Sequence, residues 1–221
     1  VYKRQPSYIF VDAPPGKEDC KRFVDLAKLI AESGLNAPRI FASDFKQGFL
    51  MISNLGNTLY LDRINKGSKE EIQKLYGESL TALLSLQQIK CTLPVFSQDL
   101  LLEEMNLFPL WFLERELKIS NYEESGFKEV SKLMLVNAEE QPQVFVHRDY
   151  HCRNLMVTCE NNPGIIDFQD AVIGPVTYDL VSLLKDCYHR FSFEQVSIWV
   201  EMYRERLISC LLYTSPSPRD S

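Results

Sequence analysis

The sequence lacks a long hydrophobic run. No apolar stretch among its 221 residues reaches the roughly 18–20 residues that a helix needs to cross a bilayer. The first residues also lack the pattern of a secretory signal peptide. We therefore expect no membrane partner and a cytoplasmic location.

Paired cysteines are lacking as well. No CxxC pair and no even spacing occurs among the six cysteines, which are at positions 20, 91, 152, 159, 187 and 210. In a chain of this size such spacing indicates reduced thiols rather than a disulfide framework.

An excess of positive charge is also missing, because the formal net charge is -6. This balance argues against nucleic acid as a partner.

The composition that remains is that of a soluble globular chain. Hydrophobic residues make up 45% of the sequence and charged residues 24%. A chain of this length and composition forms one or two domains and can bury a substantial core.

The two ends differ from the rest of the sequence. Residues 1–5 read "VYKRQ" and residues 210–221 read "CLLYTSPSPRDS". Opposite strands of one DNA element can encode "VYKRQ" and "CLLY", which indicates sequencing-adapter residues at both borders; an ordinary polar tail is the alternative. We therefore expect 6–209 to be an internal fragment of a longer protein and exclude both ends from the fold prediction.

The remaining sequence changes from strand patterns to helix patterns near residue 56. Strands are predicted at 7–13, 39–44 and 48–53, with a helix at 20–33 between the first two. Further helices are predicted at 69–89, 100–117 and 127–137. Two lobes are therefore expected, a partial β-rich one at 6–56 and a mainly helical one at 57–209, with a cleft between them.

Two short motifs place acidic and amide side chains together. "VHRDYHCRNLMV" (146–157) contains Asp149 and Asn154, and "PGIIDFQDA" (163–171) contains Asp167. If the short strands 155–159 and 164–167 pair antiparallel across the turn "ENNP", all three side chains lie at one open end. Two carboxylates and an amide oxygen suit Mg²⁺, whose remaining ligands are phosphates and waters.

These motifs match the kinase pattern H-R-D-x-x-x-x-N followed by D-F. In that pattern Asp149 is the catalytic base, while Asn154 and Asp167 hold Mg²⁺. Gln169 replaces the usual glycine, and no long activation loop follows. A small-molecule acceptor is therefore expected rather than a protein.

The sequence resembles the aminoglycoside phosphotransferase and choline kinase superfamily. Within it, the bacterial N-acetylmuramate/N-acetylglucosamine anomeric kinase family is closely similar in "VDAPPGKEDCKRFV", "GFLMISNLG", "LFPLWFLEREL", "VFVHRDYHCRNLMV" and "PGIIDFQDAVIGPVTYDLVSLLKD". The resemblance runs from about Ser7 to about Tyr203 and implies an α+β, bilobal, protein-kinase-like fold with both lobes truncated. It also implies phosphorylation of a sugar's anomeric hydroxyl with ATP and Mg²⁺ in cell-wall recycling.

The resemblance implies further site residues. The segment Ser53, Asn54 and Leu55 would meet adenine, whereas Val11 and Asp12 stand where the ATP-positioning lysine is expected. The residues themselves, apart from the resemblance, offer four candidates for acceptor binding: Arg153, which could contact phosphate instead, Asp170, which could orient the loop instead, Glu104 and Arg115. An arginine would suit a carboxylated sugar.

Other interpretations stay open at this point. His147, Asp149, His151 and Cys152 could ligate zinc, although structural zinc sites usually draw on two separated ligand pairs. His147 is expected to support the loop, Asp179 to be an N-cap or loop anchor, and Trp111 to be in the core. An aminoglycoside, choline or homoserine acceptor is the alternative within enzymes, and a non-catalytic nucleotide-binding scaffold is the alternative outside them. The oligomeric state is left open.

Overall fold

A computed structural model describes residues 7–15 and 19–214, with the side chains of the last helix described to residue 209. The expected adapter residues 1–5 and the end of the expected tail, 215–221, lie outside the described residues. Helix α7 (Phe193–Thr214) extends into the rest of that tail.

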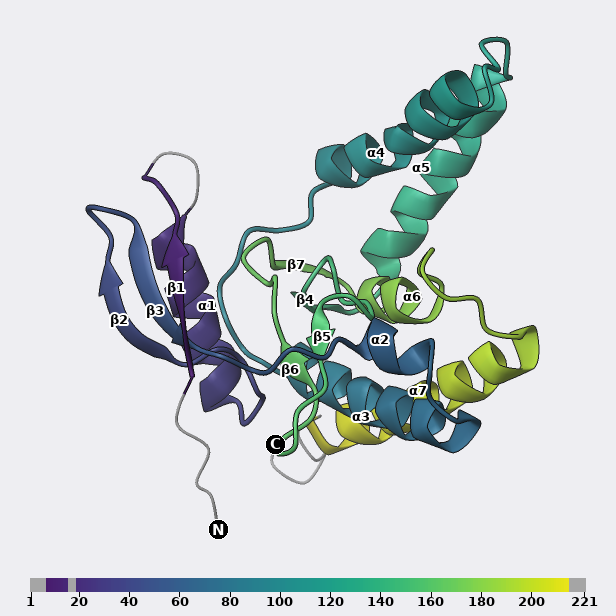
Figure 1. Ribbon diagram of the computed structural model, residues 1–221. Coiled ribbons are helices and arrows are strands. Elements are labelled where there is room, and N and C mark those ends of the chain that lie inside the picture. Colours follow the sequence, from purple (N-terminus) through teal and green to yellow (C-terminus); the bar gives the residue numbers. More distant parts are fainter. Residues whose placement is uncertain (1–6, 16–18, 215–221) are drawn as a thin grey trace, which may run out of the picture.

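The N-terminal part is a three-stranded antiparallel sheet with one helix against it (Figure 1). Its strands β1 (Tyr8–Asp12), β3 (Phe49–Ser53) and β2 (Ile40–Asp44) lie in that order. Helix α1 (Cys20–Glu32) begins at Asp19, whose side chain accepts the Arg22 N–H at 2.9 Å. Alternate residues Leu50 and Ile52 of β3 pack against α1, as the period of two predicts. The predicted order of strand, helix, strand and strand is confirmed.

The larger part is helical and contains the main core. Helices α2 (Tyr60–Ile64), α3 (Lys69–Gln87), α6 (Tyr178–Leu184) and α7 surround it. The rings of Tyr76 on α3 and Trp199 on α7 stack with centroids 4.4 Å apart. None of the described helices meets the length and hydropathy needed to span a bilayer.

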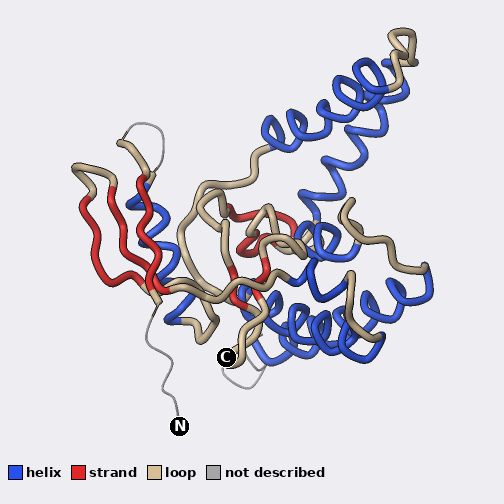
Figure 2. The backbone as a smooth tube through the Cα atoms, viewed as in Figure 1, coloured by secondary structure: helices blue, strands red, loops and turns tan. Residues whose placement is uncertain are grey.

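A helical arm projects from this body, as Figures 1 and 2 show. It consists of α4 (Gln98–Leu107), the π-helix η1 (Phe108–Glu116) and α5 (Glu124–Glu140). The helix expected at 100–117 is therefore two elements. Trp111 on η1 is 53% exposed, so the expectation that it belongs to the core is wrong. The ring lies on the surface of the projecting arm, where its described contact is with the Arg115 guanidinium of the same helix, 4.0 Å from the ring centroid.

Two small antiparallel pairs contribute Phe145, Leu155 and Ile165 to the main core. Strand β4 (Gln143–Val146) pairs with β7 (Val172–Pro175). Strand β5 (Leu155–Met156) pairs with β6 (Gly164–Ile165), which confirms the predicted hairpin. The loops that leave β4, precede β5 and follow β6 contain the polar motifs.

Candidate active site

His147 supports the loop that follows β4. Its side chain is fully buried, and Nε2 donates to the Ile166 carbonyl at 3.0 Å while Nδ1 accepts the Asp149 N–H at 3.3 Å. Burial lowers the pKa of His147 to about 4, so the ring is neutral at pH 7. A neutral ring has one donor and one acceptor nitrogen, which is what the two contacts require.

Asp179 holds the same loop from α6. Its carboxylate is fully buried and accepts the N–H of His147 at 2.7 Å and the N–H of Arg148 at 3.1 Å. Burial raises the pKa of Asp179 to about 7. The N-cap of α6 is Thr177, so of the two structural roles expected for Asp179, the loop anchor is confirmed.

Asn154 joins the other two expected residues in one corner. Its amide nitrogen donates to the Asp149 backbone carbonyl at 3.0 Å and to Asp167 Oδ2 at 3.2 Å. Asp167 has a φ of 65° and also accepts from Gln169 Nε2 at 2.8 Å. The paired strands β5 and β6 bring Asn154 and Asp167 together, as the hairpin predicted.

The Asp149 carboxylate is exposed at this corner. Partial burial is the main cause that raises its pKa above the ordinary range. The negative charges of Asp167 and Asp170 also raise this pKa, while His151 and Arg148 lower it. The side chain is therefore an accessible carboxylate with increased basicity.

The donor set fits Mg²⁺ better than zinc. Asp167 and Asn154 present hard oxygens, and Asn154 Oδ1 has no hydrogen-bond partner within 7–15 and 19–214. Over the same described ranges, no group of three or more His, Cys, Asp or Glu side chains could hold a metal ion. The zinc interpretation therefore receives no support, whereas Mg²⁺ needs only one or two carboxylates beside phosphates and waters.

The segment expected to meet adenine follows β3. The N–H of Ser53 donates to the Arg39 carbonyl at 2.9 Å, and the N–H of Asn54 donates to the Ser7 carbonyl at 3.1 Å. Leu55 makes no backbone hydrogen bond to any described residue. Among the N–H groups of this expected segment, the one that remains available is therefore that of Leu55.

The ATP-positioning lysine is expected at Val11 or Asp12, the last two residues of β1, and neither side chain is a cation. Helix α1 contributes a different cation, Arg22, which contacts the segment that follows Asp167. Arg22 donates from Nη2 to the Ala171 carbonyl at 2.6 Å, and the neighbouring Phe23 stacks on Phe168 with centroids 5.0 Å apart. Helix α1 is thus anchored to the segment that follows Asp167.

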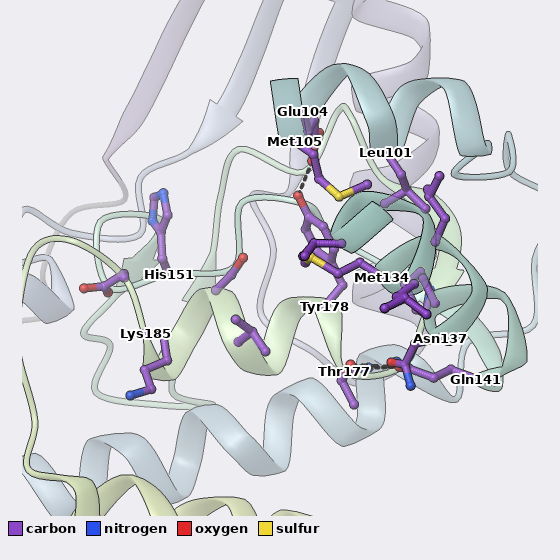
Figure 3. A pocket seen from close by; sticks show the side chains of 18 of the residues that line it. Leu101, Glu104, Met105, Met134, Asn137, Gln141, His151, Thr177, Tyr178 and Lys185 are labelled. Carbon is purple, nitrogen blue, oxygen red and sulfur yellow. Dashed lines mark hydrogen bonds between the residues drawn. The ribbon is translucent and has the colours of Figure 1, made fainter. Parts of the chain in front are cut away.

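A cavity of about 780 Å³ opens between the arm, α6 and the loop that follows β4 (Figure 3). Apolar side chains of α4 and α5 form one wall, including Leu101, Met105 and Met134. His151 and Lys185 belong to the opposite wall. The Lys185 ammonium has no hydrogen-bond or ion-pair partner among the described residues.

The four candidates for acceptor binding lie in different places. Glu104 lines the cavity, and Arg153 lies over the ring of Tyr188, a lining residue, at 5.0 Å. Asp170 is exposed near Asp149 and Arg148 but does not line the cavity. Arg115 is on η1, 4.0 Å over the Trp111 ring, and does not line it either.

Sequence reasoning missed Lys185, Tyr178 and Tyr188, which all line the cavity. Tyr178 adjoins Asp179 in the "TYDL" segment, so its proximity to the loop anchor was a usable signal. No comparable signal marks Lys185, because it is one lysine at the end of an amphipathic helix.

The family model of the phosphotransferase enzyme family matches residues 1–214. An N-acetylmuramate/N-acetylglucosamine kinase of Pseudomonas aeruginosa is 44% identical over 186 residues, which are 82% of this chain and 54% of the relative. The kinase of that name from Pseudomonas putida is 40% identical over 201 residues, 89% of this chain and 58% of the relative. This chain thus spans little more than half the length of these relatives.

Solved structures support the fold. A Streptomyces rimosus aminoglycoside phosphotransferase in complex with ADP and streptomycin matches with a TM-score of 0.66 and 14% identity. The match covers 97% of this chain and 82% of that chain. At this identity the likeness concerns the fold alone, and it confirms the expected α+β, bilobal, kinase-like architecture.

Proposed function

Because the chain belongs to the phosphotransferase enzyme family, we propose that it phosphorylates the anomeric hydroxyl of N-acetylmuramate or N-acetylglucosamine with ATP. The names of the relatives that are 40–44% identical support this substrate class. We place the reaction in the cytoplasm, as part of cell-wall recycling, without nucleic acid or membrane as a partner.

The observation that supports the reaction most directly is the hydrogen bonding of Asn154. One amide group contacts both the backbone of Asp149 and the carboxylate of Asp167, at 3.0 and 3.2 Å. In phosphoryl transfer a carboxylate orients the attacking hydroxyl and accepts its proton. We assign this role to Asp149, whose side chain is accessible and whose raised pKa favours proton uptake.

The cofactors proposed are ATP and Mg²⁺. Asp167 and the free Oδ1 of Asn154 would hold the metal ion, which when bound neutralises phosphate charge. The available N–H of Leu55 is the donor proposed for adenine, with Ser53 and Asn54 shaping the turn through their own bonds. Asp149 then receives the proton at its exposed carboxylate without serving as a metal ligand.

The cavity beside the loop is the proposed acceptor site. A cavity of about 780 Å³ is within the size range of small-molecule sites. Lys185 offers a cation there, which suits the carboxylate of N-acetylmuramate. Arg153 would add a second cation at the rim beside Tyr188, and Asp170 would face the reacting end; Arg115 on η1 is not retained as a contact.

One observation favours a second candidate. Two carboxylates, those of Glu104 and Asp186, also line the cavity, and such groups suit a cationic acceptor of the aminoglycoside or choline type. Glu104 already pairs with Arg148 at 2.6 Å. We therefore favour the sugar, and the experiment below compares both classes.

The test uses the complete gene product and follows ATP consumption with Mg²⁺ and four acceptors: N-acetylmuramate, N-acetylglucosamine, kanamycin and choline. Phosphorus NMR identifies the phosphorylated atom, and Asp149→Asn is assayed in parallel. We expect phosphate on C1 of an N-acetyl sugar, lost in the variant. Turnover of kanamycin or choline alone would refute the sugar assignment, and tight ATP binding without turnover would favour a non-catalytic scaffold.

A further inference from the structure

Glu104 connects the arm to the catalytic loop. Its Oε1 accepts from Arg148 Nη2 at 2.6 Å, and its Oε2 accepts from the Tyr178 hydroxyl at 2.5 Å. Figure 3 draws Glu104 and Tyr178 facing each other across the cavity wall. The side chains of the ion pair are only 24% and 27% exposed. Such a shielded, charge-assisted contact is stronger than an exposed surface pair.

Arg148 depends on this contact for its orientation. The Arg148 backbone has a φ of 78°, a conformation that is unfavourable for a non-glycine residue. The backbone N–H of Arg148 donates to Asp179. The side-chain Nε of Arg148 is buried and has no hydrogen-bond partner within the described ranges. The guanidinium carbon lies 5.4 Å over the Phe96 ring. Glu104 therefore provides the acceptor that keeps this partly buried cation in place.

Asp149 follows Arg148 directly, so the ion pair acts on the residue proposed as base. On the other side, the Asp149 carbonyl accepts from the His151 N–H at 3.0 Å and from Asn154 Nδ2 at 3.0 Å. The loop is thus fixed after Asp149 by its own residues and before it by Asp179 and Glu104. Of these anchors, Glu104 belongs to the arm that forms the cavity wall.

We propose that Glu104 is a positioning residue whose ion pair with Arg148 links the arm of the acceptor cavity to the orientation of Asp149. This inference rests on the proposed function, since it gives the cavity and the base their roles. It differs from the expectation that Glu104 contacts the acceptor, because both carboxylate oxygens already accept hydrogen bonds. Turning Glu104 toward an acceptor would leave the Arg148 guanidinium unpaired in a shielded place, which is costly.

The first test compares Glu104→Gln with Glu103→Gln in the complete gene product. Glu103 is the neighbouring α4 residue, is exposed, and makes no hydrogen bond or ion pair to a described residue, so the same change there is a matched control. For Glu104→Gln we expect kcat to fall about 10- to 100-fold while the KM for acceptor and for ATP changes less than about threefold. A rise in acceptor KM with unchanged kcat would instead assign Glu104 to direct binding and overturn the proposal.

A double-mutant cycle locates the effect in the ion pair. Arg148→Met should lower kcat about as much as Glu104→Gln, and the double variant should lose little more than either single variant. Arg148→Lys, which keeps a cation, should regain part of the activity. Additive losses would show that the two side chains act separately and would overturn the proposal.

Hydrogen exchange separates this inference from the proposed function. With ADP and Mg²⁺ present, amides 147–152 should exchange about tenfold faster in Glu104→Gln than in Glu103→Gln, because a local restraint is lost. If no acceptor is turned over by the wild type, the proposed function fails and this exchange still decides the role of Glu104. Equal exchange in both variants, with matching thermal unfolding, would overturn the proposal.

Discussion

The loop 147–154, between β4 and β5, and the helical arm are built by opposite means. In the loop, buried polar groups such as His147 and Asp179 bind backbone atoms and fix the chain residue by residue. In the arm, α4 has no buried residue and α5 has only Ser131. The loop is therefore specified by directed hydrogen bonds, whereas the arm offers apolar helix faces whose positions depend on few contacts.

We expect the hydrogen-bonded loop to serve the chemical step and the apolar faces of the arm to serve acceptor recognition. A base must be held within a fraction of an ångström, which directed bonds achieve. A cavity wall of Leu101, Met105 and Met134 contacts an acceptor through area and shape, so its side chains can change without loss of the reaction. Changes in the loop, or at Glu104, which bonds to it, are therefore expected to lower kcat. Changes in the apolar wall of the arm are expected to alter which acceptor is used.

Asp149→Asn is expected to have the largest effect. Removing a general base lowers kcat by about 10²- to 10⁴-fold, while ATP binding should persist because Asn154 and Asp167 are unchanged. Rates are measured at saturating acceptor, with nucleotide binding followed by calorimetry. Asp99→Asn, the same change at an exposed α4 residue, is the control, and an equal loss there would remove Asp149 from its role.

Asp179→Asn should have the next largest effect. Asparagine keeps one acceptor oxygen and turns an NH₂ group toward the other backbone donor, so the free energy of unfolding should fall by about 1–3 kcal/mol. We also expect a lower kcat, because the His147 and Arg148 amides lose their common anchor. Urea unfolding and steady-state rates measure the two effects, and a variant with wild-type values for both would contradict the loop-anchor role.

The same variant has a defined pH dependence. Unfolded aspartate ionises near about pH 3.9, whereas burial raises the pKa of Asp179 in the folded protein to about 7. Between these values the folded state binds the extra proton, so the contribution of Asp179 to the free energy of unfolding decreases as pH rises. Since asparagine does not titrate, the stability advantage of the wild type should shrink from about pH 4 to about pH 7. An advantage that grows over this window would contradict the raised pKa.

The arrangement of the loop after β4 was predictable because its signals are local. Asp149, Asn154 and Asp167 belong to two short motifs joined by one hairpin. Strand pairing brings Asn154 and Asp167 together, and Asn154 in turn donates to the Asp149 carbonyl. The cavity was not predictable in this way, since α4, α5 and α6 contribute its walls from distant parts of the sequence. Helical spacing says which residues share a face but not whether that face meets the cavity, and Arg115 does not line it.

Lys185→Met tests acceptor recognition in the cavity, which Lys185 lines from the end of α6. A hydrogen bond to a charged group contributes about 1.5–3 kcal/mol, so the KM for N-acetylmuramate should rise about 10-fold or more. The KM for N-acetylglucosamine, which lacks the carboxylate, should stay the same. Lys132→Met on α5, an exposed lysine that does not line the cavity, is the control. An equal rise for both sugars would exclude recognition of the carboxylate.

Leu133→Ala is expected to have the smallest effect and tests the arm itself. Leu133 on α5 is 70% exposed, whereas Leu83 on α3 is fully buried. Truncating Leu83 should cost about 2–5 kcal/mol of the free energy of unfolding, and truncating Leu133 less than about 0.5 kcal/mol. Thermal and urea unfolding of both variants in the complete gene product measure the difference. A cost above about 2 kcal/mol at Leu133 would mean that this face is buried in the complete protein, and that the arm is then held as firmly as the loop.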